Sequence, residues 1–462
     1  MLGEPIQVLV DTVQKLERRN AARSLRKILA STRPEDIAEV FRFLGETQRK
    51  RIFDHIDDVE IRALVLSELD TDVLPSMLEQ MTDGEIVPLL EEMSSDDTVD
   101  VLAAVADERR DALLNKMSRE DMDEAHDLLR YDPETAGGLM VPDYFALERS
   151  TTCAEAILRL QDDSADLEMA FYVYVVNENG HLVGVVTLRQ LVISPPNTAL
   201  SDIMQPDIVR VATGDDQEQV AGLVARYNLL ALPVVDDANR LVGIVTVDDV
   251  IDVIRQEATE DMLKMAGAGQ VSFGLDAREL GKAARSRMPW LLATLVGGIG
   301  ASFIIHSFEE QMLKVALLAA FIPVIIGMAG NVGTQSLTIV TRGLALGHID
   351  VTQTARVAVR ELAIGMIGGL IYGVLLGVVA VIFGHNDPGV SATGGALAFG
   401  LSVSISLCGA MIIAAVVGSV VPMMFQRLSI DPAVATGPFV TTAVDILGVL
   451  FYFGVAVFLL GI

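Results

Sequence analysis

Five long apolar stretches dominate the second half of the chain. They cover residues 289–308, 313–341, 357–384, 396–424 and 433–461. An apolar helix of about 20 residues, rising about 1.5 Å per residue, crosses the hydrocarbon core of a bilayer. The pattern therefore predicts an α-helical transmembrane domain of five spans over residues 288–462, in contact with membrane lipid.

Residues 1–135 alternate short helical patterns with signals for helix starts. A hydroxyl residue is followed three positions later by a carboxylate in four pairs: Thr32 and Glu35, Thr82 and Glu85, Ser94 and Asp97, Ser118 and Asp121. This spacing is typical of a capping box at a helix N-terminus. We predict an acidic, all-α superhelical N-terminal domain built from short helices.

Residues 136–258 contain an internal duplication. The stretch LVGVVTLRQL at 182–191 recurs as LVGIVTVDDV at 241–250, an offset of 59 residues. In each copy an apolar run, a turn and the LVG run precede a helical pattern, which indicates an αβ repeat. The region resembles a tandem pair of CBS domains, and the resemblance implies an α/β fold.

Tandem CBS pairs often bind adenosine nucleotides through a Gly, two apolar residues, Thr, two variable residues and Asp. The second copy matches this motif with Gly243, Thr246 and Asp249, whereas the first copy has Gln190 at the Asp position. The resemblance therefore implies that ATP or another adenine nucleotide binds, if at all, to the second copy. A purely structural role for the motif is the alternative.

The charge of the chain divides at the same place as its hydropathy. Residues 288–462 hold five of the 34 basic and seven of the 62 acidic residues, which leaves a formal charge of −26 on the first 287. Nucleic acid is excluded as a partner, because phosphate binding needs clustered Lys and Arg. The two cysteines, Cys153 and Cys408, form no CxxC pattern, so the sequence predicts no disulfide framework and no zinc site.

The basic residues near the spans predict their orientation. Arg342 and Arg356 follow the second span, Arg427 follows the fourth, and four basic residues lie between 278 and 287, whereas Lys314 alone lies in the outer connections. The positive-inside rule then places the N-terminus in the cytoplasm and the C-terminus outside a plasma (inner) membrane. No signal peptide is recognisable at the N-terminus.

Asp445 is the most informative residue of the spans. It lies near the middle of the fifth span, where a carboxylate costs at least a few kcal/mol unless it meets water, a cation or a partner. A cation in transit is the partner we favour, and a protonated structural Asp is the alternative. Thr441 and Thr442, one turn earlier, are expected to line the same path or to form ordinary hydrogen bonds between helices.

The second span contains an unusual stretch, PVIIGMAGNVGTQS, at 323–336. Its glycines, its proline and the amides of Asn331 and Gln335 are poor material for a regular helix, and irregular backbone in a membrane is tolerated where it lines a cavity. We therefore predict a pore wall here, with a close helix crossing as the alternative. In the third span, glycines every fourth residue from Gly365 to Gly377 predict tight helix packing.

An acidic segment connects the repeats to the first span, and we predict a plug-like connecting helix over residues 259–287. At about 100° per residue, five carboxylates share one half of the helix that enters it. They are Asp249, Asp252, Glu257, Glu260 and Asp261. A cation site and a merely solvated face are the two interpretations.

The segment GMAGNVGTQS, with Asp431, Pro432, Ala433, Pro438, Thr441, Thr442, Asp445 and Gly448, closely resembles the MgtE family of magnesium channels, and the likeness extends over almost the whole chain. It implies a homodimer whose second and fifth spans enclose the pore, with Mg²⁺ bound at Asp445. It also implies that the acidic residues 249–261 bind regulatory Mg²⁺. Gly437 stands where family members can have Asn, so no side-chain contact with the ion is expected there.

These observations favour a magnesium channel that imports Mg²⁺ and is closed by cytoplasmic Mg²⁺. Magnesium keeps several waters and binds through one or two carboxylates, whereas zinc or copper would favour thiolates or imidazoles. The same preference for ligands does not distinguish magnesium from manganese or cobalt, which stay as alternative substrates. The alternatives are a proton- or sodium-coupled divalent cation transporter and an adenylate-reading membrane sensor. No HExxH or GxxxxGK[ST] motif occurs, so we expect no enzyme.

Overall fold

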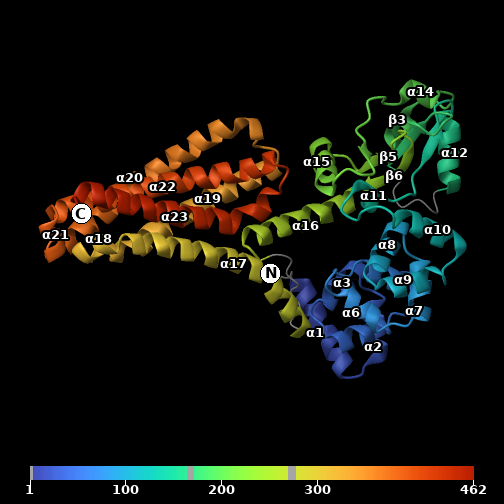
Figure 1. Ribbon diagram of the computed structural model, residues 1–462. Helices are drawn as coiled ribbons and strands as arrows, with labels where there is room; N and C mark the ends of the chain where they lie inside the picture. The colour runs from blue at the N-terminus through green and yellow to red at the C-terminus, as the bar shows by residue number, and fades with distance from the viewer. Residues whose placement is uncertain (1–3, 164–170, 269–276) are drawn as a thin grey trace. The chain divides into compact units, whose positions relative to one another are not determined.

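The computed structural model describes residues 4–163, 171–268 and 277–462. The chain forms two compact units, residues 1–255 and 256–462. The first unit holds the short helices and the duplicated region, and the second holds the long apolar helices (Figure 1).

Ten short helices form the first part of the first unit. They are α1 (Glu4–Arg18), α2 (Ala22–Leu29), α3 (Pro34–Phe41), α4 (Glu46–Phe53), α5 (Val59–Ser67), α6 (Leu74–Glu79), α7 (Asp83–Leu90), α8 (Ser95–Ala103), α9 (Asp107–Leu114) and α10 (Arg119–Leu128). Their apolar faces share one core that includes Phe41, Phe53 and Met77, all fully buried. The predicted all-α N-terminal domain is confirmed.

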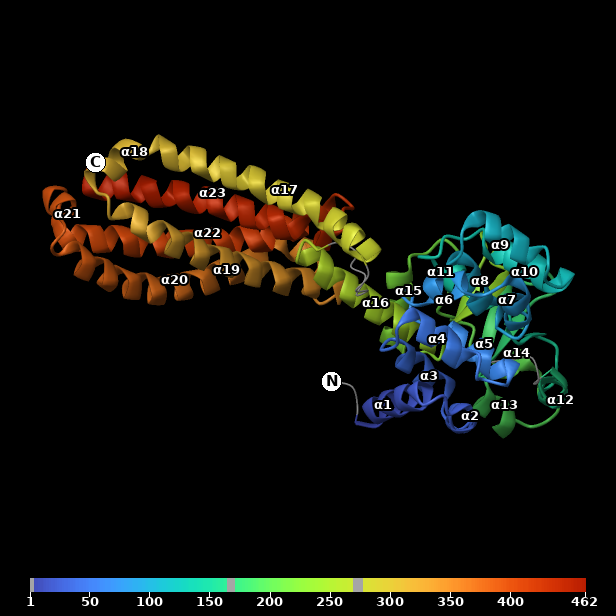
Figure 2. The same ribbon diagram turned by 90° about the horizontal axis from the view of Figure 1, so that it is seen from below.

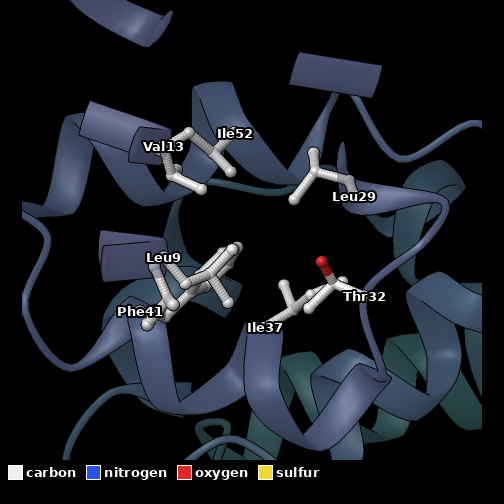
Figure 3. Close-up of a pocket in the computed structure, with 8 residues that line it drawn as sticks. Leu9, Val13, Leu29, Thr32, Ile37, Phe41 and Ile52 are labelled. Carbon is white, nitrogen blue, oxygen red and sulfur yellow. The ribbon is translucent and has the colours of Figure 1, made fainter. Parts of the chain in front are cut away.

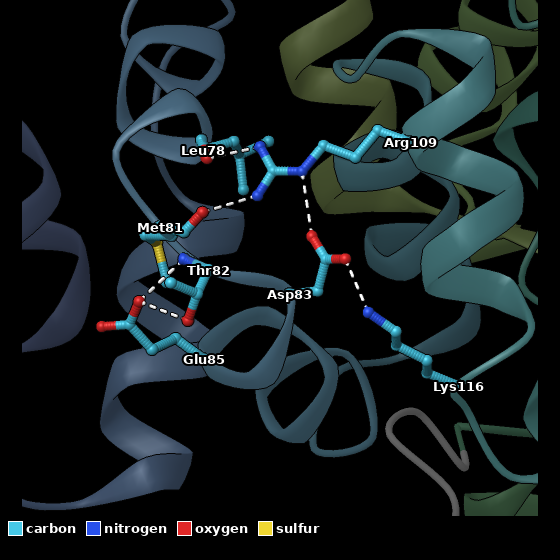
Figure 4. A network of polar contacts seen from close by, with 7 residues as sticks. All are labelled: Leu78, Met81, Thr82, Asp83, Glu85, Arg109 and Lys116. Atoms are coloured by element: carbon cyan, nitrogen blue, oxygen red, sulfur yellow. Dashed lines mark hydrogen bonds and ion pairs between the residues drawn. The ribbon is translucent and has the colours of Figure 1, made fainter.

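The predicted helix starts are mostly confirmed. Figure 4 shows the capping box of α7, in which the backbone N–H of Thr82 donates to Glu85 over 2.7 Å and the Thr82 hydroxyl donates over 2.8 Å. Nearby, the guanidinium of Arg109 donates to the carbonyls of Leu78 and Met81. The prediction for Thr32 is wrong by one residue: Arg33 precedes Pro34 at the start of α3, and the Thr32 hydroxyl donates back to Ile28.

A small apolar hollow lies between the first four helices. Figure 3 shows the side chains that surround it: Leu9, Val13, Leu29, Thr32, Ile37, Phe41 and Ile52. Thr32 is the one polar residue among them, and its hydroxyl already has a partner. The hollow is therefore a feature of packing and offers nothing to a polar ligand.

The duplicated region contains two three-stranded sheets with matching topology. The strands are β1 (Ala146–Glu148), β2 (Tyr172–Val176), β3 (Leu182–Thr187), β4 (Val211–Ala212), β5 (Ala231–Val235) and β6 (Leu241–Thr246). In each sheet the first strand is parallel to the second, and the second is antiparallel to the third. Both sheets have a register shift at the same point of the central strand, which confirms the predicted tandem α/β repeat.

Helices flank these sheets and continue beyond them. They are α11 (Ala136–Leu139), α12 (Cys153–Asp163), α13 (Leu188–Ile193), α14 (Leu200–Ile203), α15 (Gln217–Tyr227) and α16 (Val247–Met265). Helix α16 starts in the second repeat and ends in the second unit, where Gly267, with φ of +64°, closes it. The backbone N–H of Ala268 donates to Leu263 over 2.9 Å, the bond of a Schellman motif.

The prediction of one connecting helix over 259–287 needs correction. Helix α16 ends at Met265, and the next helix, α17, begins at Ala277 and runs on into the first span. Residues 269–276 lie outside the described part. The left-handed conformation at Gly267 ends α16, and glycine adopts it without strain.

The second unit is a bundle of long helices. They are α17 (Ala277–Ser307), α19 (Leu318–Ala345), α20 (Thr354–Gly384), α22 (Gly395–Arg427) and α23 (Pro432–Leu460), joined by α18 (Glu309–Lys314), η1 (Val351–Gln353) and α21 (Pro388–Ala392). Each of the five long helices is long and apolar enough to cross a membrane, which confirms the predicted number of spans. The C-terminus, α18 and α21 share one end of the bundle (Figure 1, Figure 2).

Small residues bring the long helices together. Helix α20 packs along α22, which also contacts α19 and α23, and α17 packs along α23. A Cβ placed at Gly369 would lie 2.9 Å from the Cα of Cys408 in α22, and one at Gly373 would lie 2.7 Å from the carbonyl of Ser404. The glycine stripe of the third span therefore serves tight packing, as predicted.

The prediction of irregular backbone at 323–336 is wrong, because α19 is one continuous helix through that stretch. The glycines allow close approach instead. A Cβ at Gly418 of α22 would lie 2.4 Å from the carbonyl of Gly333, and one at Gly333 would lie 3.2 Å from Val444 of α23. Glycine in a membrane helix thus admits neighbouring backbone without breaking the helix.

Candidate ion pathway and acidic sites

Asp445 lies in α23, on the side of the helix between its contact with α19 and its contact with α17. Val444 packs on α19 at Gly333, and Thr442 packs on α17 at Gly297. The exposed apolar residues Phe439, Leu447 and Leu450 lie about 120° to 160° away from Asp445 around the helix. Asp445 therefore lies away from the exposed apolar side of α23, and its side chain is partly buried.

No ion pair or hydrogen bond to Asp445 occurs within the part of the chain that the structure describes. The salt bridges of the second unit use other acids, namely Glu260, Asp431 and Glu309. An unpaired carboxylate in the middle of a span is costly unless water or a cation reaches it. This geometry fits an ion site better than a structural hydrogen bond.

The residues expected to line the path with Asp445 have different surroundings. The Thr441 hydroxyl donates to the carbonyl of Gly437, one turn earlier, over 2.8 Å. Thr442 faces α17, where a Cβ at Gly297 would lie 2.2 Å from its methyl group. Thr441 thus lies on the same side of α23 as Asp445, whereas Thr442 is turned towards the first span.

Helix α19 carries a polar stripe that the single chain leaves exposed. We define the α19 polar stripe as Asn331, Thr334, Gln335 and Thr338, all exposed. The opposite side of the helix, with Gly333 and Leu337, is buried. The hydroxyls of Thr334 and Thr338 donate to the carbonyls of Gly330 and Thr334 within the helix. The amides of Asn331 and Gln335 are the groups that need water or another protein surface, because exposed polar side chains are costly in lipid.

The end of α16 covers the first turns of α23. A Cβ at Gly437 would lie 2.6 Å from the carbonyl of Met265, so no side chain fits there. Gly267 approaches Trp290 of α17 and Pro438 of α23. Gly437 is thus a point of close contact between the first turns of α23 and the backbone at the end of α16.

A lysine that the sequence analysis did not single out holds this contact. The ammonium of Lys264 lies 2.8 Å from Asp431, the N-cap of α23, and 2.9 Å from Glu260. Burial alone would lower the pKa of Lys264, but the hydrogen bonds to both carboxylates raise it above its ordinary value. Burial, followed by the charge of Asp431, raises the pKa of Asp261. The i, i+4 spacing of Glu260 and Lys264 was the available signal.

The start of α16 lies among carboxylates of α8. Burial, with further contributions from the charges of Asp96, Asp248 and Asp97, raises the pKa of Asp249 to about 7, against the effect of a hydrogen bond from Thr246. Burial and the charge of Asp96 raise the pKa of Asp97 to about 6. The same causes, with the charge of Asp97, raise that of Asp100 to about 6. We define the α8–α16 acidic cluster as Asp96, Asp97, Asp100, Asp248 and Asp249, and burial and mutual repulsion disfavour the ionised form of Asp97, Asp100 and Asp249.

The predicted acidic face is therefore divided. Asp249 belongs to the α8–α16 acidic cluster, and Glu260 and Asp261 lie near Asp431. Between them, Asp252 is exposed and pairs with Arg255 at 3.2 Å, and Glu257 is partly buried. Among the residues that the structure describes, no three carboxylate, imidazole or thiol side chains form a group that could hold a metal ion by themselves.

The predicted nucleotide motif has structural partners. Gly243 is packed by Met140, whose sulfur would lie 2.8 Å from a Cβ there. The Thr246 hydroxyl donates to Asp249 at the start of α16. In the first repeat Thr187 and Gln190 form the equivalent capping box, with the hydroxyl 2.9 Å from the amide oxygen. Both copies thus use the motif to start a helix.

Comparisons with known proteins agree with this arrangement. Residues 322–455 match the family model of the MgtE divalent cation transporter, 32–134 match the MgtE intracellular N domain, and 136–194 and 200–256 match CBS domains. The magnesium transporter MgtE of Thermus thermophilus is 35% identical over 460 residues, covering 98% of each chain. This chain belongs to the MgtE family. It is a multi-pass membrane protein.

A second MgtE relative and one solved structure extend the likeness. The magnesium transporter MgtE of Bacillus subtilis is 34% identical over 435 residues, covering 94% of this chain and 93% of its own. The cytosolic domain of the Mg²⁺ channel MgtE in complex with ATP is 36% identical, with a TM-score of 0.50. It covers 53% of this chain and 99% of that domain. The resemblance to MgtE inferred from the sequence is confirmed.

Proposed function

We propose that this chain conducts magnesium into the cell through a pore lined by α19 and α23, with the ion at Asp445. The observation that carries the proposal is the unpaired mid-span carboxylate of Asp445 on the side of α23 away from the exposed apolar residues. A hydrated Mg²⁺ binds through one or two carboxylates and keeps its other waters, so Asp445 needs no further protein ligand. Relatives named magnesium transporters support this choice of ion.

A homodimer would complete the pore. The α19 polar stripe is exposed in the single chain, and in a bilayer it needs a polar environment. A second copy facing it would enclose a water-filled path and bring two Asp445 carboxylates to one axis. Asn331 and Thr441 would line this path, whereas Gly437 would contribute backbone at its mouth.

The N-terminus would lie in the cytoplasm and the C-terminus outside. Arg427 donates to the carbonyl of Val351 over 2.9 Å, which places it at the η1 end of the bundle. The C-terminus lies at the other end, with α18 and α21 (Figure 2). The positive-inside rule makes the η1 end cytoplasmic, because Arg342 and Arg356 flank η1 in sequence.

Cytoplasmic magnesium would close the pore. The α8–α16 acidic cluster disfavours its own ionisation, so a hydrated dication beside it would stabilise the ionised carboxylates and with them the contact between α8 and α16. Asp252, Glu257, Glu260 and Asp261 are the further regulatory ligands we propose. Magnesium must bind the closed state more tightly than the open one, since equal affinity for both would shift nothing.

ATP or a related nucleotide is the second ligand we propose, at Gly243, Thr246 and Asp249. The CBS match and the ATP complex of the similar cytosolic domain support it. The hydrogen bond between Thr246 and Asp249 would have to open for both side chains to reach a ribose. Nucleotide and magnesium would then compete for Asp249.

Magnesium flux into proteoliposomes tests the pore. We expect Asp445→Ala to abolish flux, because no other described carboxylate lies at mid-span. Glu310→Gln, which removes an exposed carboxylate at the α18 end, is the control and should leave flux unchanged. Wild-type flux in Asp445→Ala would remove Asp445 from the path. Flux that stops when proton or sodium gradients are collapsed would favour a coupled transporter over a channel.

A further inference from the structure

Glu361 is a buried acid in the transmembrane bundle that the proposed pore does not use. It lies in α20 and is 2% exposed, and it is the one acidic or basic side chain among the buried residues that the structure describes. One turn earlier, Val357 packs with Val340 and Leu344 of α19 and Met423 of α22. Glu361 thus lies next to the contact of three helices.

One oxygen of Glu361 has a partner and the other has none. The Ser336 hydroxyl of α19 donates to Oε2 over 2.8 Å, and Ser336 is itself 3% exposed. Oε1 is buried without a hydrogen-bond partner among the described residues. A half-satisfied carboxylate in a membrane interior is costly, so stability of the bundle does not explain it.

Ser336 lies on the side of α19 that faces away from the α19 polar stripe. At about 100° per residue, the four residues of the stripe lie about 100° to 160° from Ser336 around the helix axis. Directly behind Ser336 is Gly418 of α22, where a Cβ would lie 3.2 Å from the Ser336 Cβ. The close approach of Gly418 to Gly333 holds α22 against this side of α19, and the hydrogen bond from Ser336 to Glu361 adds a directional restraint on the rotation of α19.

We infer that Glu361 is a positioning residue for conduction: through Ser336 it sets the rotation of α19 and so keeps the α19 polar stripe turned towards the ion path. This inference rests on the proposed pore wall. Loss of the hydrogen bond lets α19 rotate and replaces polar atoms along the path by apolar ones. The ion site at Asp445, on another helix, keeps its own surroundings.

The first test measures magnesium flux in proteoliposomes of the full chain. We expect Ser336→Ala and Glu361→Ala each to lower the maximal flux about tenfold, the effect of one hydrogen bond to a carboxylate. The concentration for half-maximal flux should stay unchanged. The double variant should be no worse than either single one, because both remove the same bond. Glu361→Gln should restore flux, since its amide oxygen accepts the same bond.

Ser406→Ala is the matched control. Ser406 of α22 is a buried serine, like Ser336, so the change to Ala removes the same atoms. Its hydroxyl, however, has no hydrogen-bond partner among the described residues. Its flux should equal that of wild type. Additive losses in the double variant, or a Glu361→Gln variant as inactive as Glu361→Ala, would overturn the inference.

The second test reads the rotation itself and does not depend on flux. In a background with Cys153→Ala and Cys408→Ala, a water-soluble thiol reagent should label Gln335→Cys quickly and Leu337→Cys slowly, because Leu337 is 2% exposed. Adding Ser336→Ala should reduce this difference at least severalfold. An unchanged labelling ratio overturns the inference, even if flux falls.

The outcomes separate this inference from the pore proposal. If Asp445→Ala conducts like wild type, the pore proposal fails whatever Ser336 does. If Asp445→Ala is inactive while Ser336→Ala has normal flux and labelling, only the inference about Glu361 fails. Should Glu361→Ala not assemble, Ser336→Ala and Glu361→Gln carry the test, since both preserve the shape of the core.

Discussion

Removing the charge of Asp249 should stabilise the cytoplasmic region against unfolding, as we propose that bound magnesium does. Burial is the main reason that the pKa of Asp249 rises from 3.8 to about 7. At about 1.4 kcal/mol per pKa unit, ionisation of Asp249 in the folded protein is about 4 kcal/mol less favourable than in water. Asp249→Asn removes the free-energy cost of ionising this side chain and keeps an oxygen that accepts the hydrogen bond from the Thr246 hydroxyl.

The sign of the pH dependence follows from the raised pKa. Between pH 4 and 7 the folded state binds more protons at Asp249 than the unfolded state does. Stability from this group is therefore fully present at low pH and is lost as pH rises through about 7. Without magnesium, the wild-type cytoplasmic region should be more stable at pH 5.5 than at pH 8, and Asp249→Asn should flatten this dependence.

Limited proteolysis of the full chain measures the effect. If half of the 4 kcal/mol is realised, about 2 kcal/mol, the folded state of Asp249→Asn opens less often. The protease should then cleave Asp249→Asn about 30-fold more slowly than wild type at pH 8 without magnesium. Millimolar magnesium should protect wild type strongly and Asp249→Asn only weakly. Asp237→Asn, the same change at an exposed turn of the same repeat, is the control. Equal cleavage rates for the two variants under all conditions would refute the reasoning.

Three further substitutions test separate contacts. Gly437→Val should displace the end of α16, because its Cβ would lie 2.6 Å from the Met265 carbonyl, and flux at high cytoplasmic magnesium should rise. Gly369→Leu should force α20 from α22 and lower the melting temperature of the detergent-solubilised protein, since overpacking of this kind costs about 1–3 kcal/mol or more. Thr82→Ala removes the hydroxyl bond to Glu85 and should lower the free energy of unfolding in urea by about 1 kcal/mol.

The sequence predicts the fold well where one physical pattern determines the structure. Span length and hydropathy identify five membrane helices, and the repeated LVG strands identify two sheets of equal topology. The capping box at Thr82 is readable because donor and acceptor lie in the same turn. The error at Thr32 arises because Pro34 is itself favoured at the first helical position, which moves the helix start by one residue.

Prediction fails where the partner lies on another helix. Glycines in the second span suggest a broken helix, and only the position of Gly418 against Gly333 reveals that they serve packing. The helical wheel groups five carboxylates on one face, but 19 residues of α16 extend about 28 Å, so its two ends meet different surroundings. The bond between Ser336 and Glu361 joins residues 25 apart and leaves no local pattern.

The two ends of α16 differ in how their carboxylates are neutralised, and this difference indicates where the proposed regulatory magnesium would act. Near Asp431 the ammonium of Lys264 already supplies a fixed positive charge, so we expect the contact of α16 with α23 to depend less on a metal ion than the α8–α16 acidic cluster does. In the α8–α16 acidic cluster burial and like charges raise the pKa of Asp249, so ionisation is unfavourable without a bound cation. On the proposed regulation, we therefore expect a dication to change the free energy more at Asp249 than at Asp431. Asp249 and Lys264 belong to one continuous helix, so we expect magnesium at the Asp249 end to influence the contact that Lys264 makes with Asp431.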